Sequence, residues 1–220
     1  MDRKKLIAIG DSITRGTFVS HFDGSEPIYV VSDAPFAELV RRELGFTELL
    51  NYGANGIAVS STSRPNPEYA VCRFVDETET GDCVLLACGT NDFQNSFDDV
   101  ELGAETDETD VSFYGALFVL YEKIREHYDP KNVWVVTPIP RRYEQEKNKK
   151  GYVLDDYRTA IERRARAFGF HVIDGRKVAI NPEDENQRAK LMPDGLHPND
   201  DGHRVMAEYI TEKMKEYYGN

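Results

Sequence analysis

A serine hydroxyl follows directly on an apolar segment near the start of the chain. Residues 6–9 are a continuous apolar run, and Gly10, Asp11 and Ser12 come after it. Strands generally avoid these three residue types, so the change in composition predicts that a buried strand ends here, with Gly10 allowing a tight turn. A hydroxyl at such a strand end is suited to be a nucleophile. The structural alternative is that Asp11 and Ser12 only cap the following turn or helix.

A matching base and acid occur near the other end of the chain. The segment "MPDGLHPND", residues 192–200, places Asp194 three residues before His197 in a loop bounded by proline and glycine. A serine needs a base to accept its proton, and a carboxylate on the other imidazole nitrogen orients that base. Asn199 is predicted to cap the helix behind the loop. The other histidines are predicted to be structural or exposed: His21, His127, His171 and His203.

Acyl transfer also needs hydrogen-bond donors for the oxyanion that develops in the transition state. Two segments offer them. "NYGANG", residues 51–56, contains Gly53 and Gly56, and "CGTND", residues 88–92, contains the Asn91 amide. Each is an ordinary turn sequence when taken alone. Their position after predicted strands, at the same sheet edge as Ser12, favours a functional role.

The pattern of elements predicts an α/β fold, a three-layer α/β/α sandwich with a parallel sheet. Two apolar runs, "CVLLAC" and "NVWVVT", are apolar throughout, as strands covered on both faces should be. Helical patterns separate the runs, and no repeat or linker divides residues 1–220, so a single domain is expected. The predicted strands are 5–10, 47–51, 83–88, 132–137 and 170–173; the predicted helices are 35–44, 114–124, 154–168 and one from about Asp200.

Three segments do not fit the repeating strand–helix unit. They are insertions near residues 17–33, 92–110 and 140–151, of which the second is acidic and the third basic. Each follows the C-terminal end of a predicted strand, the edge where open α/β sheets bind ligands. The alternative is that they are solvated loops.

Composition limits the classes of partner. The 220 residues carry a net charge of −12, which disfavours nucleic acid and anionic membrane surfaces. No run approaches 18 apolar residues, and the first apolar run ends at Asp11, so neither a membrane span nor a secretory signal is expected. We therefore expect a cytoplasmic location. Cys72, Cys83 and Cys88 form no CxxC motif and are predicted to be buried free thiols.

Four short segments together resemble the SGNH hydrolases, also called GDSL-type esterases and lipases. "GDSITRG" is similar to the first block, with Ile13 in place of leucine, and "NYGANG", "GTND" and "DGLHPN" follow in the family's order. The resemblance implies Ser12 as nucleophile, His197 as base and Asp194 as its orienting acid. It also implies an oxyanion hole from the Ser12 and Gly53 backbone N–H groups and the Asn91 side chain. The implied fold has a five-stranded parallel sheet of flavodoxin-like order.

The residues and the resemblance together predict a serine esterase that works through an acyl-enzyme, without metal or cofactor. The acidic composition favours a small-molecule substrate, namely a short-chain or acetyl ester of a small polar compound or carbohydrate. Lysophospholipase, thioesterase or acyltransferase activity on the same fold stays open. A homo-oligomer is possible, and the sequence does not decide the oligomeric state.

Two interpretations from other classes also stay open. A metal-dependent hydrolase would use Asp194, His197, Asp201 and His203, although Asp201 and His203 are expected to face solvent at the start of a helix. A non-catalytic binding module could use the same sheet edge, but the complete set of expected functional residues argues against it.

Overall fold

A computed structural model describes residues 4–21, 26–63, 68, 70–94 and 98–218. Five parallel strands form the central sheet in the order β4-β1-β5-β6-β7, which is the predicted flavodoxin-like order. β1 lies between β4 and β5, so its C-terminal end opens near the middle of the sheet. The strands are β1 (Lys5–Gly10), β4 (Glu48–Gly53), β5 (Cys83–Ala87), β6 (Val133–Val136) and β7 (His171–Ile173).

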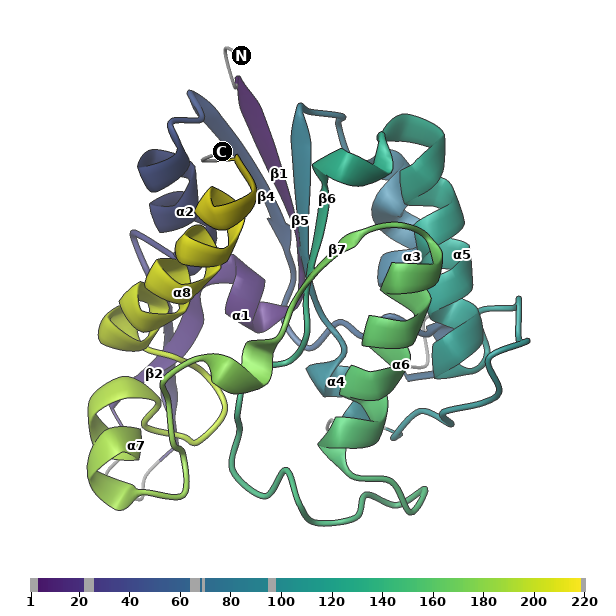
Figure 1. Cartoon of the computed structure of the whole chain (residues 1–220). Coiled ribbons are helices and arrows are strands. Elements are labelled where there is room, and N and C mark those ends of the chain that lie inside the picture. Colours follow the sequence, from purple (N-terminus) through teal and green to yellow (C-terminus); the bar gives the residue numbers. More distant parts are fainter. Residues whose placement is uncertain (1–3, 22–25, 64–67, 69, 95–97, 219–220) are drawn as a thin grey trace.

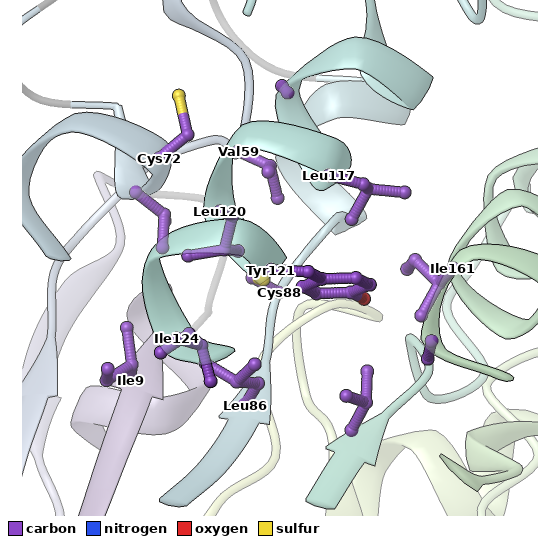
Figure 2. Close-up of a cluster of buried hydrophobic side chains, with 14 of the residues drawn as sticks. Ile9, Val59, Cys72, Leu86, Cys88, Leu117, Leu120, Tyr121, Ile124 and Ile161 are labelled. Atoms are coloured by element: carbon purple, nitrogen blue, oxygen red, sulfur yellow. The ribbon is translucent and has the colours of Figure 1, made fainter. Parts of the chain in front are cut away.

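Helices cover both faces of this sheet, as the apolar runs predict (Figure 1). Along β1, Leu6 and Ala8 belong to the core cluster beneath α2 (Phe36–Leu44) and α8 (Asp200–Tyr218). Ile7 and Ile9 belong to the cluster beneath α3 (Val71–Phe74), α5 (Phe113–His127) and α6 (Leu154–Ala167). Alternate side chains of a strand point to opposite faces, so a continuous apolar run is needed when both faces are covered. Figure 2 shows the second cluster, where side chains of α5 and α6 meet β1 and β5.

The helix boundaries follow the expected capping residues. α2 begins directly after Pro35 and ends at Gly45, whose φ of 76° suits glycine. α8 begins at the predicted Asp200, with Asp200 and Asp201 in its first turn. The helices are α1 (Ser12–Arg15), α2 (Phe36–Leu44), α3 (Val71–Phe74), α4 (Thr90–Phe93), α5 (Phe113–His127), α6 (Leu154–Ala167), α7 (Glu185–Leu191) and α8 (Asp200–Tyr218).

The described residues of the three insertions lie at the C-terminal edge of the sheet, and they are not simple solvated loops. The first contains an antiparallel hairpin of β2 (Thr17–His21) and β3 (Ile28–Val31), which the sequence analysis did not predict. The basic insertion is tied to the acidic one: Asn148 Nδ2 donates to the Phe93 carbonyl at 2.7 Å, and the Lys149 N–H donates to Asp99 at 2.7 Å. The acidic and basic insertions therefore form one connected rim.

The cysteines behave as predicted. Cys72, Cys83 and Cys88 are free and buried. Burial raises the pKa of Cys72 to about 12 and that of Cys88 well above its ordinary value, so neither thiol is a nucleophile at neutral pH. Among the helices of the described ranges, none combines the length and the apolar character that crossing a membrane requires.

Candidate active site

Ser12 is the first residue of α1, immediately beyond the end of β1. Asp11 caps this helix, because its Oδ1 accepts the Ile13 N–H at 2.9 Å. The capping interpretation is therefore correct for Asp11, while Ser12 presents its hydroxyl at the sheet edge. The N–H of Ser12 lies at the helix start and has no hydrogen-bond partner among the described residues.

Gly10 is required by close packing rather than by a tight turn. A Cβ atom at this position would lie 2.1 Å from the Ala87 carbonyl oxygen and 2.3 Å from Thr14 Oγ1. The Thr14 hydroxyl itself donates to the Ala87 carbonyl at 3.0 Å. This contact holds α1 against the end of β5, and it corrects the expected role of Gly10.

The structure brings Ser12, His197 and Asp194 together. Ser12 Oγ lies 2.9 Å from His197 Nε2, and His197 Nδ1 lies 2.6 Å from Asp194 Oδ2. When Nδ1 donates its proton to the carboxylate, Nε2 is left as the acceptor for the serine hydroxyl. Ser12 is 5% exposed and His197 8%, so the two groups are largely shielded from water while still reachable.

Asp194 also shapes the turn that carries the histidine. Its Oδ1 accepts the N–H groups of Leu196 at 2.9 Å and of His197 at 2.7 Å. Burial raises the pKa of Asp194, but the hydrogen bond and charge of His197 and the two N–H groups outweigh it, so the net pKa lies below its ordinary value. The carboxylate is therefore ionised at neutral pH and can stabilise an imidazolium.

The Asp–His turn, residues 194–197, is held by a contact within it and by the helix cap that follows it. Gly195 has a φ of 76°, and its carbonyl accepts the Arg142 N–H at 2.7 Å. Asn199 caps α8 as predicted, since its Oδ1 accepts the Gly202 N–H at 3.0 Å. The turn thus connects the basic insertion to the last helix, which restricts the position of the imidazole.

Asn91 lies in α4 and is largely buried, at 6% exposure. Its Nδ2 donates to the Ile57 carbonyl at 2.8 Å, which joins α4 to the loop after β4. The neighbouring Asp92 strengthens this joint by accepting the N–H groups of Val59 and Ser60.

Gly53 does not have its predicted role. Its N–H donates to Asn51 Oδ1 at 2.9 Å, and a Cβ atom on Gly53 would lie 2.2 Å from the Arg15 nitrogen. The glycine therefore lets the end of β4 approach α1 closely, and its N–H is engaged within the chain. Gly56, in the same quoted segment, has a φ of 63° and an N–H with no hydrogen-bond partner in the described part of the chain.

The structure confirms His203 as a structural histidine, whereas the expectation that it faces solvent at the start of a helix is wrong. Its ring is fully buried and stacks on Phe36, whose N–H points to His203 Nδ1 at 3.4 Å. Burial lowers the pKa of His203 to about 4. Asp201 instead forms an ion pair with Arg204 on the surface. The four residues of the metal hypothesis are thus not gathered, and no group of three candidate ligands exists among the residues that the structure describes.

The hairpin supplies a site residue that the sequence analysis missed. The Tyr29 ring lies edge-on to His197, with 5.9 Å between the ring centroids, and Tyr29 is 55% exposed. Burial and the charge of Asp194 raise the pKa of its phenol. No local signal marks Tyr29, because its position follows from the hairpin packing beside the Asp–His turn.

Comparison with known proteins identifies the family of the chain. The family model described as GDSL-like Lipase/Acylhydrolase family matches residues 8–205. No curated protein matches the chain.

Solved structures share the fold at low sequence identity. A protein from Lactobacillus plantarum has a TM-score of 0.79 at 22% identity, with 98% of each chain covered. A lipase/acylhydrolase from Enterococcus faecalis has a TM-score of 0.64 at 20% identity, with 97% of this chain and 96% of that chain covered. A possible lipase from Chitinophaga pinensis has a TM-score of 0.69 at 18% identity, with 97% and 98% covered. Since the family model spans most of its length, this chain belongs to the GDSL-like lipase/acylhydrolase family.

Proposed function

We propose that the protein is a serine esterase in which Ser12 is the nucleophile, His197 the general base and Asp194 the orienting acid. The observation that carries the proposal is the continuous hydrogen-bonded chain from Ser12 Oγ through both ring nitrogens of His197 to Asp194. Such a chain raises the nucleophilicity of an otherwise weak hydroxyl.

The reaction follows from this arrangement in two halves. Ser12 Oγ attacks the ester carbonyl carbon, and its proton passes to His197 Nε2. The imidazolium, stabilised by the ionised Asp194, then returns that proton to the leaving alcohol as the carbon–oxygen bond breaks. Water attacks the resulting acyl-enzyme by the same route and releases the carboxylic acid and the free serine.

The oxyanion donors of the proposal are the Ser12 N–H, the Asn91 side chain and, in place of Gly53, the Gly56 N–H. The choice of Gly56 is supported by its positive φ and by its neighbour Ile57, whose carbonyl accepts from Asn91 at 2.8 Å. Donors placed before the reaction stabilise the developing charge without reorganisation.

For the substrate, we propose a short-chain or acetyl ester of a small polar compound or carbohydrate. The polar rim that the insertions form at the sheet edge, with Lys150 paired to Glu101, supports a polar substrate. An alcohol in place of water at the acyl-enzyme would give acyl transfer instead. Cytoplasmic location stays a prediction from the sequence.

The test is an esterase assay of the wild type and Ser12→Ala on acyl chains from acetyl upward. We expect turnover of short chains and its loss in Ser12→Ala, while Ser20→Ala, at an exposed serine of the hairpin, keeps the wild-type rate. Equal rates for wild type and Ser12→Ala would disprove the nucleophile assignment. Activity confined to long chains would disprove the acetyl preference and leave the mechanism intact.

A further inference from the structure

The basic insertion presents two arginines on a rigid support beside the proposed catalytic residues. The buried guanidinium of Arg158, 1% exposed, donates to the carbonyls of Pro138 and Ile139 and to the Glu144 carboxylate. These bonds fix both sides of the segment that contains Arg141 and Arg142. The segment is therefore a positioned part of the site and not a loop that solvent alone surrounds.

Both arginines are placed at the site by specific contacts. The Arg142 N–H donates to the Gly195 carbonyl, and its side chain lies so close to Gly195 that a Cβ there would be 2.8 Å from Arg142 Cβ. On the other side, the Arg141 guanidinium donates to Thr90, which precedes Asn91, and to Gln94, which follows the last residue of α4. One arginine thus borders the Asp–His turn, and the other borders the proposed oxyanion donor.

Neither guanidinium forms a direct ion pair with a carboxylate in the described part of the chain, although Asp11, Asp194 and Glu144 act on Arg141 through their charge. Arg141 Nη1 and Nη2 contact only neutral oxygens of Thr90 and Gln94, and the Arg142 guanidinium lies over the Tyr143 ring at 4.6 Å. The Nε atoms of both arginines are buried without a hydrogen-bond partner. The chain has more acidic than basic residues, 39 against 27, so carboxylates are abundant. Arg176, for comparison, forms ion pairs with three of them. Unpaired charge that is partly buried is costly to keep.

The backbone at this point is also strained. Tyr143 has a φ of 62°, the one positive value outside glycine among the described residues, and its N–H donates to Glu183 at 2.9 Å. Strained residues of this kind cluster at ligand sites, where the surrounding structure maintains them. Here the strained residue carries the ring on which Arg142 lies.

We propose that Arg141 and Arg142 bind an anionic group, a carboxylate or a phosphate, on the ester that Ser12 cleaves. The inference rests on the proposed function and specifies its substrate class. The planar fork of a guanidinium matches the paired oxygens of either group. Burial lowers the pKa of Arg141 to about 10, against the opposing charges of Asp11 and Asp194, so the cation persists at neutral pH within electrostatic range of the site.

The experiment compares para-acetoxybenzoate with its neutral carboxamide, two acetyl esters of nearly equal shape. We expect the wild type to favour the carboxylate in kcat/KM, chiefly through KM, and added salt to reduce the preference. Arg142→Gln is expected to lower kcat/KM for the carboxylate by about 10- to 100-fold, and for the carboxamide by less than about threefold. An acetyl ester with a phosphate at the same ring position then shows which anion is bound better.

Controls separate this inference from the proposed function. Arg166→Gln removes the same charge from an exposed position on α6 and is expected to leave the preference intact. Ser12→Ala should abolish turnover of both esters. If the wild type cleaves the carboxamide as well as the carboxylate, or if Arg142→Gln lowers both rates equally, the anion site is disproved while the esterase proposal stands.

Discussion

Ser12 Oγ lies 2.9 Å from His197 Nε2, although 185 positions separate the two residues in the chain. The interior strand β1 ends just before the serine, and the turn before α8 carries the imidazole. α8 packs with α2 on one face of the sheet (Figure 1), and this packing places the start of α8 near the C-terminal end of β1. The proposed proton transfer from Ser12 to His197 therefore depends on how these two elements are placed by the fold.

The position of the proton on the His197 ring should depend on the carboxylate of Asp194. In Asp194→Asn, Oδ1 can still accept the two backbone N–H groups, but an amide donor would face His197 Nδ1 in place of Oδ2. The ring would then carry its proton on Nε2 and could not accept from Ser12. We expect kcat to fall by about a hundred- to ten-thousandfold with little change in Tm. Asp201→Asn, at a surface ion pair, is the matched control, and equal rates in the two variants would contradict the role of Asp194.

Asn91 should contribute to the transition state beyond its structural bond. Removing an oxyanion donor costs about two to three orders of magnitude in kcat, so Asn91→Ala should lose that much with a smaller change in KM. Asn148→Ala is the structural comparison, because its Nδ2 also donates to a backbone carbonyl, that of Phe93. We expect Asn148→Ala to lower Tm comparably and kcat by less than about tenfold. A kcat for Asn91→Ala equal to that of Asn148→Ala would reduce Asn91 to a structural residue.

Gly53→Ala should destabilise the fold. The added Cβ would lie 2.2 Å from the Arg15 nitrogen and 2.6 Å from its Cα, which are backbone atoms that cannot rotate away. We expect a loss of about 1–3 kcal/mol in the free energy of unfolding, measured by denaturant titration. Gly45→Ala is a useful comparison, since that position is open and only the positive φ is strained. A Gly53→Ala protein of wild-type stability would disprove the close approach of β4 and α1.

Asp92 should make the stability depend on pH. Burial raises its pKa to about 7, although the N–H groups of Val59 and Ser60 oppose the shift, so the folded state holds the proton more tightly than the unfolded chain does. The stabilisation that protonated Asp92 gives the folded state is fully present below the unfolded pKa near 4 and is lost as the pH rises to about 7. Over this range the free energy of unfolding should fall by at most about 1.4 kcal/mol per pH unit.

Asp92→Asn removes this titration and keeps an acceptor oxygen for the two N–H groups. Its free energy of unfolding, measured between pH 4 and 8, should fall less steeply than that of the wild type in the window up to about pH 7. Burial also raises the pKa of Asp11 to about 6, so in both proteins the free energy of unfolding should still fall as the pH rises to about 6. Parallel profiles for wild type and variant would contradict the raised pKa of Asp92.

Local patterns were enough to predict the strands of the sheet. They also indicated Ser12, Asp194 and His197 as candidate site residues, which the structure brings together. A strand that is buried on both faces is a continuous apolar run, which is easily recognised in a sequence. The Asp194–His197 turn and the Asn199 cap are also recognisable, because their hydrogen bonds join residues only three positions apart. The strand order followed from the resemblance and is confirmed by the structure.

Tertiary structure alone decided which groups are engaged and which are available. Gly53 and Gly56 look alike in "NYGANG", but the contact of Gly53 with α1 and its bond to Asn51 depend on how β4 pairs with β1. The burial of His203 depends likewise on α2, and the contacts of Arg141 depend on α4, which lies about 50 positions earlier in the chain. Periodicity reports which face of an element is apolar, whereas these properties arise between elements that meet only on folding.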